Sequence, residues 1–213
     1  RGDTAWSNID NRATAIEGQA HALAVDMLES LHTTHLGWKQ DRATLLDTIR
    51  EIYGEPSGNA KAAKAGAAFS KAAEYLRERY NRAGGFIPKL INWGMPQIHE
   101  QVKVAKAGMD EWINYTLPKL NREAMLNPDG RIMSDDELMA AMRESYKTIS
   151  TGGQNKQTPG AFKGAGKLAN RHQDSRFLVF KDADSWIEYQ ERFGSPDMFN
   201  VMVGHIRSMS SEI

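Results

Sequence analysis

The sequence predicts a mainly α-helical protein, with at most one or two short strands. Apolar residues recur at steps of three and four along most of the chain, which is the spacing of one helix face. Residues that cap helix N-termini stand before several of these stripes, and glycines stand after them. Together these observations favour a helical bundle followed by a glycine-rich loop and a small helical C-terminal unit.

Three helices joined by short loops are expected in the first 85 residues. Asp41 is placed to cap the second helix, Ser57 to begin the third, and Gly84–Gly85 to end it. The stretch 60–73 includes eight alanines, which lets a neighbouring helix approach closely. The expected helices cover residues 6–36, 41–53 and 57–83.

The middle of the chain has more interruptions. Pro96 suits the first turn of a helix over about 97–107, and Pro118 stops or kinks the helix that continues from it. Ser134 and Glu137 form a capping box, which is the most strongly marked helix start in the sequence. We therefore expect one helical domain over residues 1–150.

Residues 151–170 hold five glycines and one proline, which predicts a flexible linker or loop. Over residues 151–181 there are six Lys or Arg against one Asp, whereas residues 182–213 carry six acids against two bases. The balanced total of 27 basic and 27 acidic residues therefore hides a basic loop followed by an acidic tail. The basic loop is our candidate for contact with nucleic-acid phosphates or an acidic partner, through Lys156, Lys163, Lys167, Arg171 and Arg176.

The last unit, residues 171–213, begins with an apolar run at Phe177–Phe180 that suits a short strand. Asp182 or Asp184 then caps a helix that ends at Gly194, and Ser195 caps the next, with Pro196 in its first turn. The first of these helices carries one aromatic face. We expect this face, made of Trp186, Tyr189 and Phe193, to pack in a core rather than bind a ligand.

The composition excludes some classes of site. The chain has no cysteine, which removes disulfides, thiolate zinc sites and cysteine nucleophiles. No apolar run approaches the roughly 20 residues that a membrane span needs. Because Ile213 falls inside a helical pattern without a stop signal, we expect the chain to be part of a longer protein.

Metal binding is weakly indicated. His32 and His35 lie three residues apart, but two ligands do not make a site. His99–Glu100 begins like a zinc-protease helix, yet Lys103 occupies the position of the second histidine. The stretch 127–132 copies part of a calcium loop, although a turn before the helix that Ser134 caps explains the same residues. We therefore predict no metal site and no cofactor.

One catalytic alternative remains open. Glu144–Ser145 is similar to the catalytic Glu-Ser pair of lytic transglycosylases, in which a carboxylic acid with a raised pKa cleaves peptidoglycan. The glycine-containing block that follows in those enzymes is missing here. Glu144 is the candidate catalytic residue only if it lies in a cleft.

The stretch RFLVFKDADSWIEYQERFGSPDMFNVMVGHIRSM, residues 176–209, resembles a segment of very long virion-associated proteins of tailed bacteriophages and prophages. The resemblance rests on the Arg-Phe-Gly helix end and on the pattern Phe199, Met202, His205. It implies a structural or interaction segment of an internal or DNA-ejection protein, assembled in the bacterial cytoplasm and located in the virion. The implied partners are other virion proteins, further domains of the same chain, and DNA bound without sequence preference.

Overall fold

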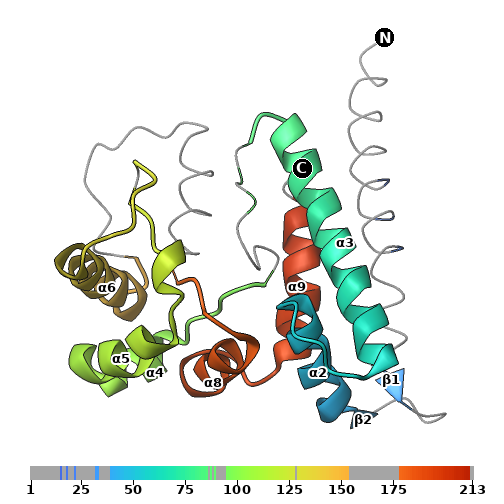
Figure 1. Ribbon diagram of the computed structural model, residues 1–213, viewed down its shortest axis with the longest axis horizontal. Helices are drawn as coiled ribbons and strands as arrows, with labels where there is room; N and C mark the ends of the chain where they lie inside the picture. The colour runs from blue at the N-terminus through green and yellow to red at the C-terminus, as the bar shows by residue number, and fades with distance from the viewer. Residues whose placement is uncertain are drawn as a thin grey trace. The chain divides into compact units, whose positions relative to one another are not determined.

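The computed structural model describes residues 39–85, 87, 89, 95–127, 129–153 and 178–211, together with positions 15, 18, 22, 32 and 33. Within these residues the fold is mainly α-helical, as predicted (Figure 1). The α-helices are α2 (Arg42–Ile52), α3 (Ala60–Arg82), α4 (Gln101–Ala107), α5 (Met109–Thr116), α6 (Asp135–Ser150), α8 (Ala183–Phe193) and α9 (Met198–Ser211). Two 3-10 turns, η1 (Leu117–Lys119) and η2 (Arg122–Ala124), and one antiparallel pair of two-residue strands, β1 (His32–Thr33) and β2 (Lys39–Gln40), complete the described elements.

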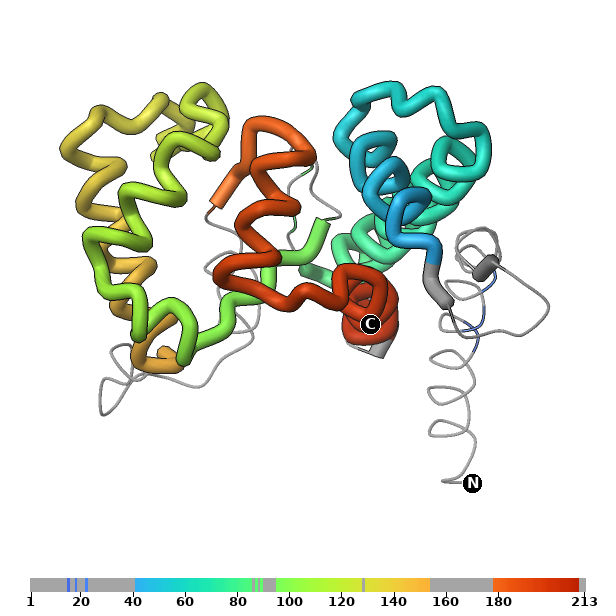
Figure 2. Tube along the Cα trace, turned by 90° about the horizontal axis from the view of Figure 1, so that it is seen from below, coloured from blue at the N-terminus to red at the C-terminus, as the bar shows by residue number. Residues whose placement is uncertain are grey.

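The chain divides into two compact units. The first unit takes Arg1–Pro96 and Phe199–Ile213, and the second takes Gln97–Met198. Helices α2, α3 and most of α9 therefore belong to the first unit, and α4, α5, α6 and α8 to the second (Figure 2). This grouping differs from the expected helical domain over 1–150, because α4 and α8 pack together although they lie far apart in the sequence.

In the first unit, α2 and α3 form a closely packed pair. Asp41 caps α2 as predicted, and its carboxylate accepts hydrogen bonds from the N–H groups of Ala43 and Thr44. Helix α3 begins later than predicted. Asn59 caps it, while the N–H and hydroxyl of Ser57 both donate to Glu51 Oε1 at 2.7 Å. The capture of Ser57 by Glu51 thus explains the later start.

A helical glycine marks the closest approach of these two helices. A Cβ added to Gly66 would lie 3.0 Å from the Cβ of Glu51 and 3.3 Å from the carbonyl oxygen of Thr48. The surrounding face of α3 consists largely of buried alanines. Small side chains therefore let α2 approach α3, as the alanine-rich stretch predicted.

In the second unit, the first helix is shorter than predicted. Helix α4 begins at Gln101 rather than near Gln97, and the Glu100 N–H donates instead to the carbonyl oxygen of Phe193 at 2.8 Å. Gly108, with a φ of 83°, separates α4 from α5. Helix α5 ends at Thr116 and passes into η1, which contains Pro118, so the predicted stop at this proline is confirmed.

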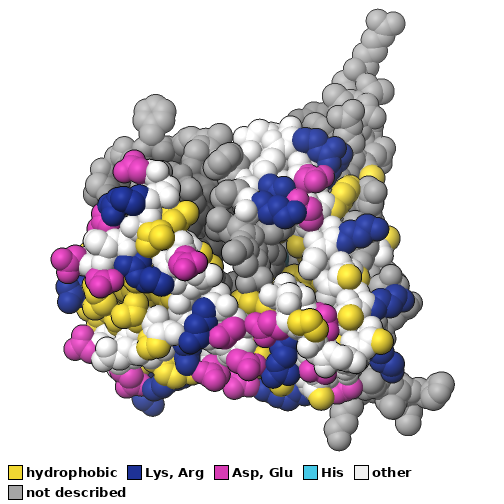
Figure 3. Space-filling view, viewed as in Figure 1, with side chains coloured by type: hydrophobic (Ala, Val, Ile, Leu, Met, Phe, Trp, Pro, Cys, Tyr) yellow, Lys and Arg dark blue, Asp and Glu magenta, His cyan; other side chains and the backbone are white. Residues whose placement is uncertain are grey.

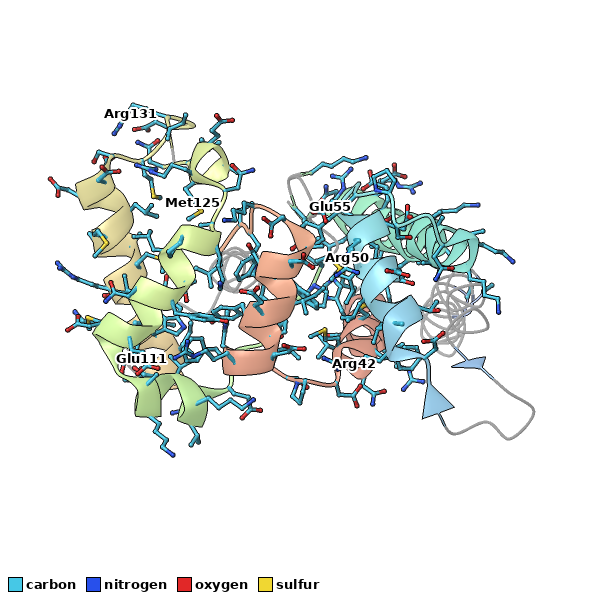
Figure 4. All side chains as sticks on the ribbon, turned by 60° about the horizontal axis from the view of Figure 1, so that its bottom comes forward. Arg42, Arg50, Glu55, Glu111, Met125 and Arg131 are labelled. Atoms are coloured by element: carbon cyan, nitrogen blue, oxygen red, sulfur yellow. The ribbon has the colours of Figure 1, made fainter. Side chains whose placement is uncertain are left out.

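A turn and a capped helix follow. Leu126 and Ile132 form an isolated antiparallel bridge, and the Asn127 side chain accepts hydrogen bonds from the N–H groups of Asp129 and Arg131. The capping box of Ser134 and Glu137 at the start of α6 is confirmed. Figure 4 shows Arg131 at the tip of this turn and Met125 at its base.

Helix α8 lies in the core of the second unit. Asp182, one of the two predicted caps, accepts a hydrogen bond from the Ser185 N–H at 2.7 Å, and the helix ends before Gly194. The aromatic face of Trp186, Tyr189 and Phe193 is buried, as predicted.

The segments on either side of α8 differ in how far they match the predictions. Before α8, Phe180 makes an isolated antiparallel bridge with Leu120, while Phe177 lies outside the described residues. After it, α9 begins at Met198, two residues beyond Pro196. In α9, Phe199, Val201, Met202, Ile206 and Met209 are buried along one side of the helix.

Candidate functional site

The hydroxyl of Tyr189, in the second unit, makes two side-chain hydrogen bonds. Helix α8 presents it to Trp112 of α5 and to His99, which precedes α4. The Tyr189 oxygen lies 3.2 Å from Trp112 Nε1 and 2.7 Å from His99 Nδ1. Trp112 and Tyr189 are completely buried, whereas His99 is half-buried. One hydroxyl thus joins three separate elements through its hydrogen bonds.

The direction of these hydrogen bonds follows from the chemistry of the three side chains. An indole N–H can only donate, so the Tyr189 oxygen accepts from Trp112. Burial raises the pKa of Tyr189 above its usual value, which keeps the hydroxyl protonated. The hydroxyl then donates to Nδ1 of His99. An Nδ1 that accepts this hydrogen bond corresponds to the ring tautomer with its proton on Nε2.

The aromatic rings around this hydroxyl form a cluster. The ring of Tyr189 stands edge-on to that of His99, with centroids 5.6 Å apart, and is tilted against Phe180 and Phe193 at 5.1 and 5.8 Å. The ring of Trp112 is tilted against Tyr146 of α6 at 6.0 Å. These are ordinary geometries for packed aromatic side chains. The cluster therefore serves as the core that fixes the His99 ring.

A second, more exposed group of side chains joins α5 to α8 around the ring of Tyr115. Its hydroxyl donates to the carbonyl oxygen of Glu188 at 3.3 Å. Lys119 pairs with the Glu188 carboxylate at 2.6 Å, and Arg192 pairs with Glu111 at 2.5 Å. Glu111 is labelled in Figure 4. Each of these charged side chains has an opposite charge beside it. Together with the Tyr115 hydrogen bond, the two ion pairs hold the α5–η1 segment against α8.

Apolar side chains also reach the surface of the second unit. Val102 on α4 is 74% exposed, and Ile98, Leu126 and Ile132 are between 37% and 48% exposed. These four are the large apolar side chains that stand out as exposed among the described residues. Leu126 and Ile132 are cross-strand partners, so they present a neighbouring pair rather than two isolated groups. Figure 3 shows apolar side chains at the surface over the region of α4, α5 and α6.

The structure places the predicted catalytic candidate at the surface. Glu144 lies on an exposed position of α6, and its backbone carbonyl accepts a hydrogen bond from the Thr148 hydroxyl. A general acid that cleaves a glycan lies in a cleft beside the bond it breaks, whereas Glu144 is exposed. Its position in the fold therefore gives no support to glycan cleavage.

The other predicted contacts fall largely outside the described residues. All five basic candidates lie there, namely Lys156, Lys163, Lys167, Arg171 and Arg176. His35 lies there as well, and for His32 only the backbone, in β1, is described. In the part of the chain that the structure describes, no group of three His, Asp or Glu side chains is arranged to hold a metal ion. The calcium-like stretch forms the predicted turn, and Met125, which stands two residues before it, is buried.

Comparisons of the chain with family models, with curated proteins and with solved structures found no match. None of the helices in the described ranges has the length and apolar character required to cross a membrane. The functional argument accordingly depends on the residues of this chain alone.

Sequence reasoning identified Tyr189 as a core residue and missed its hydrogen bond to His99. The two residues are 90 positions apart, and neither sits in a motif that points to the other. A buried tyrosine hydroxyl usually finds a hydrogen-bond partner, which was the available signal. That signal shows that Tyr189 needs a partner without saying which residue provides it.

Proposed function

We propose that this chain is a structural and interaction segment of a large virion-associated protein of a tailed bacteriophage or prophage, of the internal or DNA-ejection type. In this proposal its partners are other virion proteins or further domains of the same protein. The proposal rests first on the resemblance of residues 176–209 to such proteins. The mainly helical fold is compatible with it.

The structural observation that supports an interaction role is the exposed apolar surface of the second unit. Val102 on α4 and the cross-strand pair Leu126 and Ile132 expose apolar area to water, which is unfavourable unless another surface covers it. In contrast, the polar groups around Tyr189 are occupied in holding α5 and α8 together. This distribution favours assembly through apolar contacts over chemistry at the polar cluster.

The decisive experiment tests whether the gene product is part of the phage particle. We expect mass spectrometry of gradient-purified particles, produced in a host that carries the gene, to detect peptides of this chain in a fixed ratio to the capsid protein. Val102→Asp and Ile132→Asp should lower this ratio, because they place a charge in an apolar contact. Ala140→Asp, which adds the same charge at an exposed position of α6, is the matched control.

Absence of the chain from particles would overturn the virion assignment. Normal incorporation of both charged variants would instead remove the apolar surface as the contact. Cleavage of peptidoglycan by the purified protein, abolished by Glu144→Gln but not by Glu123→Gln at another exposed position, would establish the enzymatic alternative.

The DNA contact in this proposal is tested separately. Binding to duplex DNA should be detectable at low salt and weaken at moderate salt, because phosphate contacts release condensed counterions. Replacing the basic set Lys156, Lys163, Lys167, Arg171 and Arg176 by glutamine should abolish this binding. A wild-type chain that fails to bind at low salt has no such role.

A further inference from the structure

One surface of helix α3, in the first unit, carries a row of lysines. Residues 60–73 contain three lysines and no acidic residue. Lys61, Lys64 and Lys71 are all exposed, and the other exposed residues of this stretch are three alanines and Ser70. We call this exposed surface the lysine face. Figure 3 shows Lys and Arg side chains at intervals along α3.

The three lysines share one side of the helix. At 3.6 residues per turn, their positions fall within about 80° around the helix axis. All three point away from Gly66, where α2 approaches α3 most closely. Lys71 lies about 15 Å from Lys61 along the axis, and over that length each strand of a duplex presents about four phosphates. This spacing suits a row of phosphates better than a single anion.

Helix α3 as a whole is basic. It carries six Lys or Arg against two Glu, and its first turn contains no acidic residue. Glu74 pairs with Arg77 at 2.7 Å. Glu78 pairs with Arg82 at 3.7 Å. Because the N-terminal end of a helix adds its own positive potential, the field is reinforced at Lys61.

An acidic group stands near the N-terminal end of the lysine face. The pKa of Asp41 is lowered mainly by hydrogen bonds from Thr44 and in smaller part by the charge of Lys61. The Asp41 carboxylate is already engaged in capping α2. Exposed ion pairs contribute little, so an exposed lysine can exchange such a neighbour for a phosphate. Phosphate binding at this face therefore does not require lysines that lack other contacts.

We propose that the lysine face binds the phosphate backbone of duplex DNA without sequence preference. The residues between the lysines decide among the possible polyanions. Alanine and serine have no bulky apolar side chain to enter a lipid surface and no aromatic ring on which the bases of a single strand stack. They also lack the large anchors that dominate protein interfaces and the long polar groups that read base edges.

The lysine face adds contacts to a DNA complex rather than forming one alone. Three phosphate contacts hold a duplex weakly, since proteins that bind DNA firmly make roughly six to ten. The inference therefore rests on the DNA binding of the proposed function. It assigns a part of that binding to α3, separately from the five basic candidates between Lys156 and Arg176.

The test measures binding of the full chain to a fluorescently labelled DNA duplex between about 50 and 200 mM salt. Lys61→Gln, Lys64→Gln and Lys71→Gln are introduced singly and together, and glutamine keeps nearly the helix propensity of lysine. Each single variant should bind about five- to tenfold more weakly at about 100 mM salt. The triple variant should reduce the slope of log K against log salt by about 2.7.

A triple variant of the second unit is the matched control. Lys106→Gln, Arg143→Gln and Lys147→Gln remove the same charge from exposed positions of α4 and α6. Helix α6 also carries three acidic residues in its first turn, so its surface does not present lysines alone. This control should keep the salt slope within about one unit of the wild-type value.

Lysine acetylation, quantified by mass spectrometry, gives a readout that needs no substitution. With the duplex present, Lys61, Lys64 and Lys71 should react several-fold more slowly. Lys106 and Lys147 should react at the same rate with and without the duplex. This measurement keeps the test decisive even where a variant fails to fold.

The possible failures can be told apart. A triple α3 variant with wild-type affinity and salt slope, or α3 lysines that the duplex leaves unprotected, would overturn this inference while the DNA binding of the proposed function stands. A triple variant that loses binding to anionic phospholipid vesicles but not to DNA would assign the face to a membrane surface instead. A wild-type chain that binds no duplex at low salt would reject the DNA contact of the proposed function, and this inference with it.

Discussion

The guanidinium group of Arg192 lies over the ring of Tyr115, 4.1 Å from the ring centroid. Lys119 Nζ lies 4.4 Å from the same centroid. One aromatic ring of α5 therefore contacts two cations, one from η1 and one from α8. Since both cations also pair with carboxylates, the ring links two ion pairs that would otherwise be separate surface contacts.

Replacing the ring of Tyr115 should reveal how much its cation–π contacts contribute to the unfolding free energy of the second unit. Tyr115→Leu removes both cation–π contacts, and we expect the second unit to lose about 1–2 kcal/mol of unfolding free energy. Tyr115→Phe keeps the ring and loses only the 3.3 Å hydrogen bond to Glu188, so its loss should be smaller. Urea denaturation of the two variants checks this order, and equal losses would show that the hydroxyl rather than the ring matters.

Two glycines are predicted to respond to alanine in opposite directions. A Cβ on Gly194 would lie 2.7 Å from the carbonyl oxygen of Ile98 and would also clash with the buried amide oxygen of Gln190. Gly194→Ala should therefore destabilise the chain by about 1–3 kcal/mol through overpacking. Gly204 lies inside α9 with nothing within 4 Å of such a Cβ. Gly204→Ala should stabilise the chain by up to about 1 kcal/mol through helix propensity.

Thermal denaturation in one buffer checks both glycine variants. The two substitutions add the same methyl group, so opposite shifts of the melting temperature would reflect the clash at Gly194 and the gain in helix propensity at Gly204. A Gly194→Ala protein as stable as wild type would mean that the segment at Ile98 moves without cost.

Acid stability should depend on Glu74 in the first unit. The guanidinium of Arg77 hydrogen-bonds to both of its carboxylate oxygens, at 2.7 and 3.0 Å, and holds the pKa of Glu74 down at about 2. A lowered folded pKa means that this stabilisation is complete above the ordinary value of 4.5 and is lost as the pH falls from there toward 2. Because a quarter of the side chain is exposed, we expect a contribution on the order of 1–2 kcal/mol.

The variant Glu74→Gln should therefore flatten the decline in stability between about pH 4.5 and 2. Glu78→Gln is the matched control on the same helix, because Glu78 forms an exposed pair with Arg82 at 3.7 Å. Urea midpoints measured across this pH range provide the comparison. If Glu78→Gln flattened the profile as much as Glu74→Gln, the bidentate pair would not be the cause.

The features that the sequence predicted well are those determined by neighbouring residues. Asp41 caps α2 through the next three residues, and the box of Ser134 and Glu137 is closed within one turn. The buried aromatic face of α8 follows from helical spacing alone. In each case the physical partners lie within about one or two helical turns of each other.

The features that were not predicted depend on residues far away in the sequence. The start of α4 is delayed because the Glu100 N–H bonds to Phe193, and the start of α3 because Glu51 captures Ser57. The pairing of His99 with Tyr189 is of the same kind. Helical periodicity carries no information about such contacts, so neither the division into units nor the candidate site could be derived from it.

The second unit lies within the sequence of the first, between Pro96 and Phe199. A ribosome that synthesises this chain therefore completes residues 97–198 before it releases α9, although α2 and α3 emerged much earlier. Since units of this size can fold while translation continues, the inserted unit can reach its final structure first. The first unit can consequently be completed only after α9 has been synthesised.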